Sequence, residues 1–128
     1  MKIVVDSSII IDYLRGGKKW DDFLSAAEAE GALQLLLPTI VIFELYSGSS
    51  TKSIRKLQDM TYFISQFDRI DLSENIARLA GELARDVKQH IQAPDYIIAA
   101  SALQVNASLV TLNQKHFAQI PNLSVYPL

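Results

Sequence analysis

The chain has 128 residues, of which 49% are hydrophobic and 20% are charged, and its formal net charge at pH 7 is −2. This balance argues against intrinsic disorder and fits one domain with a substantial core. The chain has no cysteine, which excludes disulfides and thiolate metal sites, and its most apolar stretch, 33–43, is too short to cross a membrane as a helix. We therefore expect a soluble, cytoplasmic protein.

The first half of the chain alternates between short apolar runs and amphipathic segments. Short β-branched or leucine-rich runs predict buried strands, and a Ser or Thr before an amphipathic segment predicts the start of a helix. In chain order we expect a strand at 2–5, a helix capped by Ser7 or Ser8 that runs to about Arg15, a helix at 18–30, a strand at 32–37, a helix capped by Thr39 that ends at Gly48, and a helix that opens at Ser49 or Ser53 and runs to about Gln66.

The second half continues this alternation. We expect a short strand at 69–71, a helix capped by Ser73 that runs from 74 to about 90, a helix with Pro94 in its first position, and strands at 108–112 and 124–126. Strands that alternate with helices predict a mostly parallel sheet with helices on both faces. The expected fold class is α/β, as a single domain spanning 1–128 whose sheet has four to five strands.

Three acidic residues stand alone in apolar surroundings: Asp6 in KIVVDSSIII, Glu44 in TIVIFELYSG and Asp95 in APDYIIAASAL. Burying a charge is costly unless the group is paired, protonated or bound to a metal. Three such positions far apart in the sequence therefore indicate one shared acidic site.

Each of these acids also has a structural interpretation. Asp6 ends the first strand, where ligands bind in open α/β sheets, but it also precedes a helix that it could cap. Because Ser7 and Ser8 offer better-placed caps, a metal-binding carboxylate is favoured at position 6. Glu44 fits a partly exposed helical residue equally well. Asp95 fits the first turn of a helix, where acids complement the helix dipole.

Four segments carry a resemblance to a known family: VVDSSIIIDYLRG, LPTIVIFELYSG, APDYIIAASAL and ASLVTLNQKHFAQIPNL. The third is close to the signature D-x-x-I-A-A-x-A-L, and the fourth has a Thr-x-Asn strand end before Phe and Ile-Pro. In this order the segments resemble the PIN-domain ribonucleases, and among them the VapC-type toxins of prokaryotic toxin–antitoxin pairs. The resemblance spans positions 2 to 123.

The resemblance implies a metal-dependent endoribonuclease in which Asp6, Glu44 and Asp95 are the three principal catalytic acids and metal ligands. Clustered carboxylates repel one another unless a divalent cation neutralises them. Oxygen ligands that leave waters on the metal suit Mg²⁺ or Mn²⁺. Such an ion can activate water for attack on phosphorus and stabilise the leaving oxygen.

Three further site residues follow from family position alone. Ser7 and Thr111 would hold metal-bound water or a phosphate through their hydroxyls. Many PIN nucleases carry a fourth acid where this chain has Asn113, and no acid follows Asp95 in the sequence. We therefore predict one firmly held ion, with any second ion weak or recruited with the RNA.

The expected partners are RNA, a cognate antitoxin protein that enters the acidic groove, and a second copy of the chain. Arg15, Lys18 and Lys19 follow the first helix near the proposed site, so we expect them to bind RNA. The basic residues within 52–56 have helical spacing too, but a solvated helix face is their more common role. His90 and His116 do not neighbour a matched acid in the sequence, and we expect both on the surface.

Other functions remain as alternatives. A phospho-acceptor signalling domain needs a second acid beside Asp6, and a haloacid-dehalogenase-like phosphatase needs Asp-x-Asp, but positions 7 and 8 are serine. The main alternative is a PIN-fold protein that binds RNA or a partner with weak or no nuclease activity, given Asn113.

Overall fold

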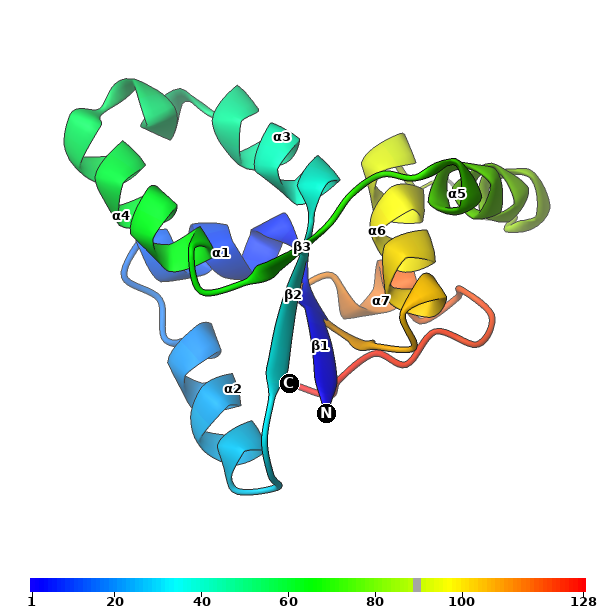
Figure 1. Cartoon of the computed structure of the whole chain (residues 1–128), viewed down its shortest axis with the longest axis horizontal. Coiled ribbons are helices and arrows are strands. Elements are labelled where there is room, and N and C mark those ends of the chain that lie inside the picture. The colour runs from blue at the N-terminus through cyan, green and yellow to red at the C-terminus, as the bar shows by residue number, and fades with distance from the viewer. Residues whose placement is uncertain (89–90) are drawn as a thin grey trace.

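Four short strands pair into one sheet in the computed structural model, which describes residues 1–88 and 91–128 (Figure 1). The strands are β1 (Lys2–Val5), β2 (Gln34–Pro38), β3 (Asp68–Ile70) and β4 (Ser108–Val110). Their spatial order is β3-β2-β1-β4, and every neighbouring pair is parallel. The predicted α/β class with a parallel sheet is confirmed.

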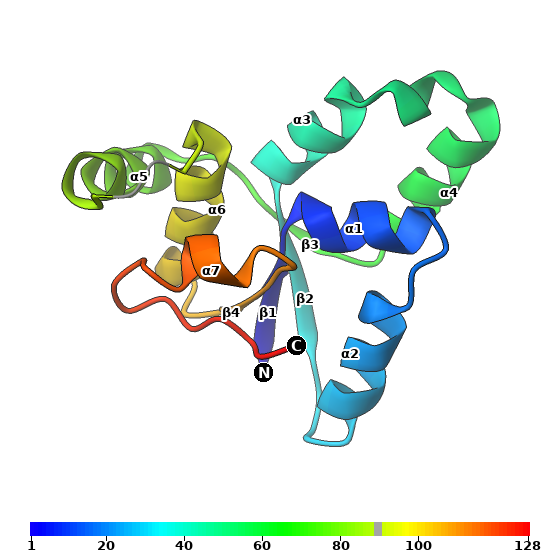
Figure 2. The same cartoon turned by 180° about the vertical axis from the view of Figure 1, so that it is seen from behind.

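Helices cover both faces of the sheet. They are α1 (Ser7–Leu14), α2 (Lys19–Glu28), α3 (Thr39–Ser47), the 3₁₀ helix η1 (Ser49–Lys52), α4 (Ile54–Ile64), α5 (Glu74–Asp86), α6 (Ala93–Gln104) and α7 (Gln114–Phe117). In Figures 1 and 2, α1, α2 and α4 lie on one side of the sheet and α5, α6 and α7 on the other, while α3 continues beyond the end of β2. Within the part of the chain that the structure describes, no helix is long and apolar enough to span a bilayer.

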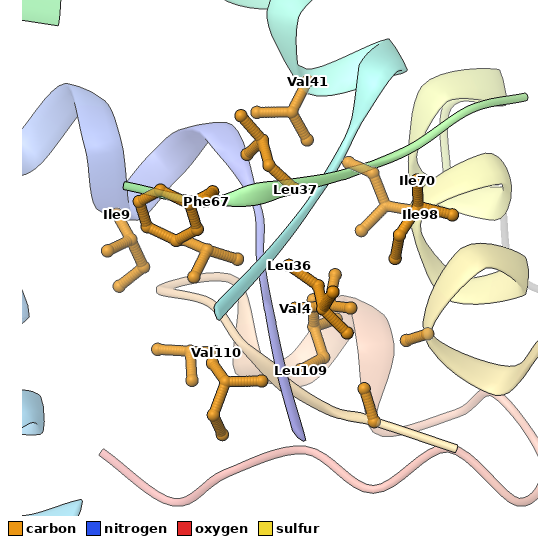
Figure 3. Packing of buried hydrophobic residues seen from close by; sticks show 14 of the residues in the cluster. Val4, Ile9, Leu36, Leu37, Val41, Phe67, Ile70, Ile98, Leu109 and Val110 are labelled. Carbon is orange, nitrogen blue, oxygen red and sulfur yellow. The ribbon is translucent and has the colours of Figure 1, made fainter. Parts of the chain in front are cut away.

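The core is centred on β1, whose residues Ile3, Val4 and Val5 are all fully buried. Val4 is the register partner of Leu36 on β2 and of Leu109 on β4, so these three side chains form one row across the sheet (Figure 3). Each fully buried side chain of this size stabilises the fold by about 1.5–3 kcal/mol. This packing holds the carboxyl end of β1 in a fixed place at the middle of the sheet.

The strand order creates a topological switch point beside β1. After β1 the chain builds β2 and β3 on one side and then crosses over to build β4 on the other. In open α/β sheets the crevice beyond the carboxyl ends of such diverging strands is where ligands bind. Asp6 directly follows β1 and Thr111 directly follows β4, so both lie at this crevice, whereas the two termini lie at the opposite end of the sheet (Figure 1).

The segment 124–126 does not form the strand that its sequence predicts. It makes a single parallel bridge, between Leu109 and Val125. The flanking bonds are Leu109 N–H to the Ser124 carbonyl and Tyr126 N–H to the Leu109 carbonyl, each 2.8 Å long. The next residue is Pro127, which has no N–H to continue a ladder. The sheet therefore has four strands among the described residues.

The helix after Ser73 is shorter than its expected range to about residue 90. It ends at Asp86 because Val87 adopts extended backbone angles (φ −82°, ψ 123°) and packs its side chain against the core. His90, which we expected on the surface, lies outside the described residues.

The predicted helix caps are partly confirmed. The Ser53 and Ser73 hydroxyls accept hydrogen bonds from backbone N–H groups in the first turns of α4 and α5, as expected. The prediction of Thr39 as a cap is wrong, because β2 runs directly into α3 and Pro38 takes the N-cap position. The short helix α7 was not expected, since four residues are too few to show helical periodicity.

Candidate functional site

Asp6 is the first residue after β1, and only 2% of its surface is exposed. Its Oδ1 accepts hydrogen bonds from the Ser8 backbone N–H, at 3.0 Å, and from the Ser8 hydroxyl, so Asp6 caps α1. The prediction that Ser7 or Ser8 caps this helix is therefore wrong. Capping occupies one carboxylate oxygen, so it does not prevent the other from taking part in a site.

The second oxygen of Asp6 is held from the segment that follows the neighbouring strand, β4. The buried Thr111 hydroxyl donates a hydrogen bond to Asp6 Oδ2 at 2.6 Å. Thr111 Oγ1 in turn accepts from the Asn113 backbone N–H at 2.9 Å. On the other side, Ser8 Oγ accepts from the Leu112 backbone N–H at 3.0 Å. These bonds fasten the segment after β4 to Asp6 and fix the orientation of its carboxylate.

The environment of Asp6 favours its protonated form. Burial raises the pKa of Asp6 above its ordinary value, and the negative charge of Asp95 raises it further. Hydrogen bonds from Ser8 and Thr111 oppose this shift, because they stabilise the carboxylate.

Glu44 lies on α3 and is half-buried. The Ser7 hydroxyl donates a hydrogen bond to its carboxylate, whereas Glu44 Oε1 is buried and has no hydrogen-bond partner. Burial raises the pKa of Glu44, the hydrogen bond from Ser7 lowers it, and the charges of Asp95 and Asp6 raise it. An unpaired, buried carboxylate oxygen costs free energy, so it points to a cation or a donor that would normally face it.

Asp95 lies in the first turn of α6, as predicted. Its carboxylate accepts a hydrogen bond from the backbone N–H of Gln92, the N-cap residue, which is one half of a capping box. Burial raises the pKa of Asp95, and the nearby positive charge of His116 on α7 opposes the rise. His116 is exposed, as expected, but its proximity to an acid was not anticipated.

The fold brings the three isolated acids close enough for their charges to interact. Asp95 acts on both Asp6 and Glu44, and Asp6 acts on Glu44. Within residues 1–88 and 91–128, no three Asp, Glu, His or Cys side chains already form a set of metal ligands. The site is therefore a group of coupled carboxylates at the switch point of the sheet.

The predicted supporting residues have different places in this site. Ser7 contacts Glu44, and Thr111 contacts Asp6. Asn113 joins the network through its backbone N–H and is exposed to solvent. Ser8 bonds to Asp6 but was not among the expected site residues. Its position two residues after an N-cap aspartate is the signal that predicts this contact.

A cleft of about 420 Å³ opens beside Glu44, and residues of α1, α3 and α4 line it. Arg15, one of the expected RNA-binding residues, lines this cleft together with Lys56 from the second basic group. Lys18 and Lys19 do not line it, and Lys19 borders a separate hollow near Tyr126. The apolar part of the cleft is formed by Ile11, Leu14, Leu45 and Met60.

Comparison with known proteins agrees with this architecture. The PIN domain family model matches residues 3–123. The chain is 32% identical over 123 residues to Ribonuclease VapC19 of Mycobacterium tuberculosis, an alignment that covers 94% of this chain and 95% of the relative. The structure of VapBC2 from Rickettsia felis bound to a DNA fragment from their promoter has a TM-score of 0.79 at 28% identity and covers 98% of both chains. A toxin–antitoxin complex from Klebsiella pneumoniae has a TM-score of 0.79 at 28% identity and covers 98% of this chain and 99% of that one. The chain therefore belongs to the PIN-domain family and is grouped with its VapC-type members.

Proposed function

We propose that this chain is an endoribonuclease that hydrolyses RNA phosphodiester bonds and depends on a divalent cation held by Asp6, Glu44 and Asp95. The observation that carries the proposal is the convergence of three carboxylates with raised pKa values at the switch point of the sheet. Carboxylates whose pKa values are shifted by burial and by one another are typical of active sites. The similarity to a relative named as a ribonuclease, over nearly the entire chain, supports this function.

The donor set fits a hard divalent cation such as Mg²⁺ or Mn²⁺. Glu44 Oε1 is buried without a hydrogen-bond partner, and the three carboxylates repel one another when they are ionised. Carboxylate oxygens are the ligands that these ions prefer, and Mg²⁺ usually keeps several waters besides one or two carboxylates. When bound, the ion supplies stabilisation of charge on the phosphoryl group and a water of lowered pKa.

The chain's own residues orient the carboxylates and oppose the effect of burial on their pKa values. Thr111 and Ser8 donate to opposite oxygens of Asp6, which lowers its pKa against the effect of burial. Ser7 does the same for one oxygen of Glu44. The N–H of the N-cap residue of α6 and the charge of His116 favour ionised Asp95. These interactions only partly offset the effect of burial, and the pKa values of all three acids stay raised, so a bound cation would be what favours their ionised form.

Asn113 occupies the place of the fourth acid and brings no charge. We propose that one ion is held firmly and that any second ion is weak or arrives with the RNA. The same residue favours a second candidate function, in which the chain binds RNA or a protein partner with little cleavage. The side chain of Asn113 is exposed and only its backbone N–H joins the network around Asp6, so it adds no negative charge to the three acids.

We further propose that a small antitoxin protein binds this chain and inhibits it. We also propose that the chain forms a homodimer and acts in the cytoplasm, where its RNA substrate lies. The likeness to a solved toxin–antitoxin complex supports the antitoxin partner. A guanidinium group from the partner would form charge-assisted hydrogen bonds with the carboxylates and would compete with the cation.

The test is cleavage of total RNA by the purified protein with Mg²⁺, with Mn²⁺ or with EDTA. Asp6→Asn should lower the cleavage rate on the order of 10²-fold or more, because it removes one charge from the cation site. Asp21→Asn is a matched control, since Asp21 is an exposed aspartate on α2. Cleavage that survives Asp6→Asn or EDTA would contradict the proposal. No cleavage by the wild type would favour the binding function.

A further inference from the structure

The cleft beside Glu44 is lined by two positively charged side chains that the proposed cleavage chemistry does not use. Arg15 follows the last turn of α1, and Lys56 lies in the first turn of α4. Both line the cleft, and neither forms an ion pair with another residue in the described parts of the chain. Glu44, at the acidic site, is the other charged residue in the lining.

This distribution of charge makes the cleft different from the site that it adjoins. The acidic site attracts cations, whereas the cleft presents two positive charges from helices that contact each other. Like charges on neighbouring helices repel, and an anion between them would remove that repulsion. A ligand that spans both regions would therefore be favoured by negative charge near Arg15 and Lys56.

The remaining lining of the cleft is suited to the other parts of a nucleotide. Leu14 and Met60 contribute to an apolar wall, and Ser49 and Ser53 contribute hydroxyl-bearing residues. A volume of about 420 Å³ lies within the range of pockets that hold small ligands, about 300–1,000 Å³. A nucleotide would match each part of this lining. Its phosphates would contact Arg15 and Lys56, and its ribose or base would pack against the apolar wall.

We propose that this cleft binds nucleotides of single-stranded RNA next to the scissile bond, with backbone phosphates on Arg15 and Lys56. The inference rests on the proposed RNA cleavage. It says where the RNA strand lies after it leaves the three acids. Proteins that read RNA commonly bind single-stranded segments, whose bases are free to pack on side chains. A peptide that carries arginine toward the carboxylates would meet like charges here, so RNA fits the cleft better than such a partner.

The test is binding of a fluorescently labelled single-stranded 12-nucleotide RNA, measured by anisotropy in EDTA so that no cation supports cleavage. The double variant Arg15→Gln/Lys56→Gln is compared with Lys18→Gln/Lys19→Gln, which removes the same charge from outside the cleft. The cleft variant should lose affinity on the order of tenfold at 0.1 M salt. Its slope of log affinity against log salt should become shallower by about 1.4, because each phosphate contact on a single strand contributes about 0.7.

Circular dichroism spectra of both variants establish that they remain folded. Equal affinities of the two double variants, or a larger loss for Lys18→Gln/Lys19→Gln, would overturn the assignment. If the cleft variant keeps its RNA affinity but no longer binds a co-expressed antitoxin, the cleft is instead the binding site of that protein. Cleavage by the wild type with Mg²⁺ is measured separately. If the cleft variant alone loses RNA affinity but the wild type does not cleave RNA, the cleft assignment stands and the proposed nuclease activity is refuted. If the wild type cleaves RNA but the cleft variant binds it as tightly as the control variant does, the nuclease activity stands and the cleft assignment is refuted.

Discussion

Replacing Glu44 by glutamine should stabilise the metal-free protein while it abolishes activity. Glu44 has a buried oxygen without a partner, and its charge is opposed by those of Asp95 and Asp6. Leaving a buried polar group unsatisfied costs about 1–3 kcal/mol, and more when the group is charged. Glutamine keeps the shape of the side chain and still leaves one buried polar atom without a hydrogen-bond partner. The substitution therefore removes only the free-energy cost of burying the negative charge.

Because Glu44 is half-buried and solvent screens part of its charge, the gain lies at the low end of this range. We expect the free energy of unfolding to rise by about 1 kcal/mol at pH 7, which raises the Tm by about 3–5 °C for a domain of this size.

This gain should depend on pH in one direction. The pKa of Glu44 is raised in the folded state, so the folded protein binds the proton more tightly than the unfolded chain does. Below the ordinary glutamate pKa of 4.5, Glu44 is neutral in both states and the substitution should have little effect. As the pH rises through the raised value, the wild type loses stability relative to the variant. The difference should then stay constant at higher pH.

Thermal unfolding followed by circular dichroism in EDTA, at pH 4 and pH 7, measures both points. Glu30→Gln serves as the control, since Glu30 is exposed in the turn after α2. Its Tm should change little at either pH. The reasoning is refuted if Glu44→Gln lowers the Tm at pH 7, or raises it equally at pH 4 and pH 7.

Four further outcomes follow from the same site. Thr111→Val removes the 2.6 Å hydrogen bond to Asp6, so it should cost about 1 kcal/mol of stability and raise the pKa of Asp6. The acidic side of the pH profile of the cleavage rate should then move to higher pH. Thr111→Ser should restore both the stability and the profile, and an unchanged profile in Thr111→Val would contradict this role. Calorimetric titration with Mn²⁺ should show one tight site, and two equal tight sites in the free protein would be inconsistent with Asn113. Asn113→Asp should strengthen a second, weaker site in the same titration, and no change would show that this position lies away from the ion. Expression of the wild type should arrest growth and Asp95→Ala should relieve the arrest, whereas normal growth with the wild type would remove the support for a toxin.

The fold class and the three acids could be predicted because their signals are local. A lone charge in an apolar run is visible in the sequence, as at Asp6 and Glu44, and the strand–helix alternation predicts which ends of the strands face the ligand. The capping role of Asp6 was recognised but not favoured, because Ser7 or Ser8 was expected as the cap, whereas α1 already begins at Ser7. A shift of about one residue is common for helix ends, and here it changes which side chain reaches the free N–H groups.

Other parts of the site could not be predicted because they depend on tertiary packing. His116 acts on Asp95 only because the fold brings residues of two different helices, α7 and α6, near each other. Lys56 lines the cleft because α4 packs against α1, which brings it to the same cleft as Arg15. Lys18 follows Arg15 closely in the sequence, yet the turn at 16–17 separates it from that cleft.

The central claim is that Asp6, Glu44 and Asp95 hold one divalent cation at the switch point of the sheet. Anomalous diffraction from a crystal grown with Mn²⁺ tests it most directly. We predict one strong anomalous peak in contact with oxygens of these carboxylates, close to Glu44 Oε1. A map without a peak there, with the three carboxylates turned away from one another, would contradict the account.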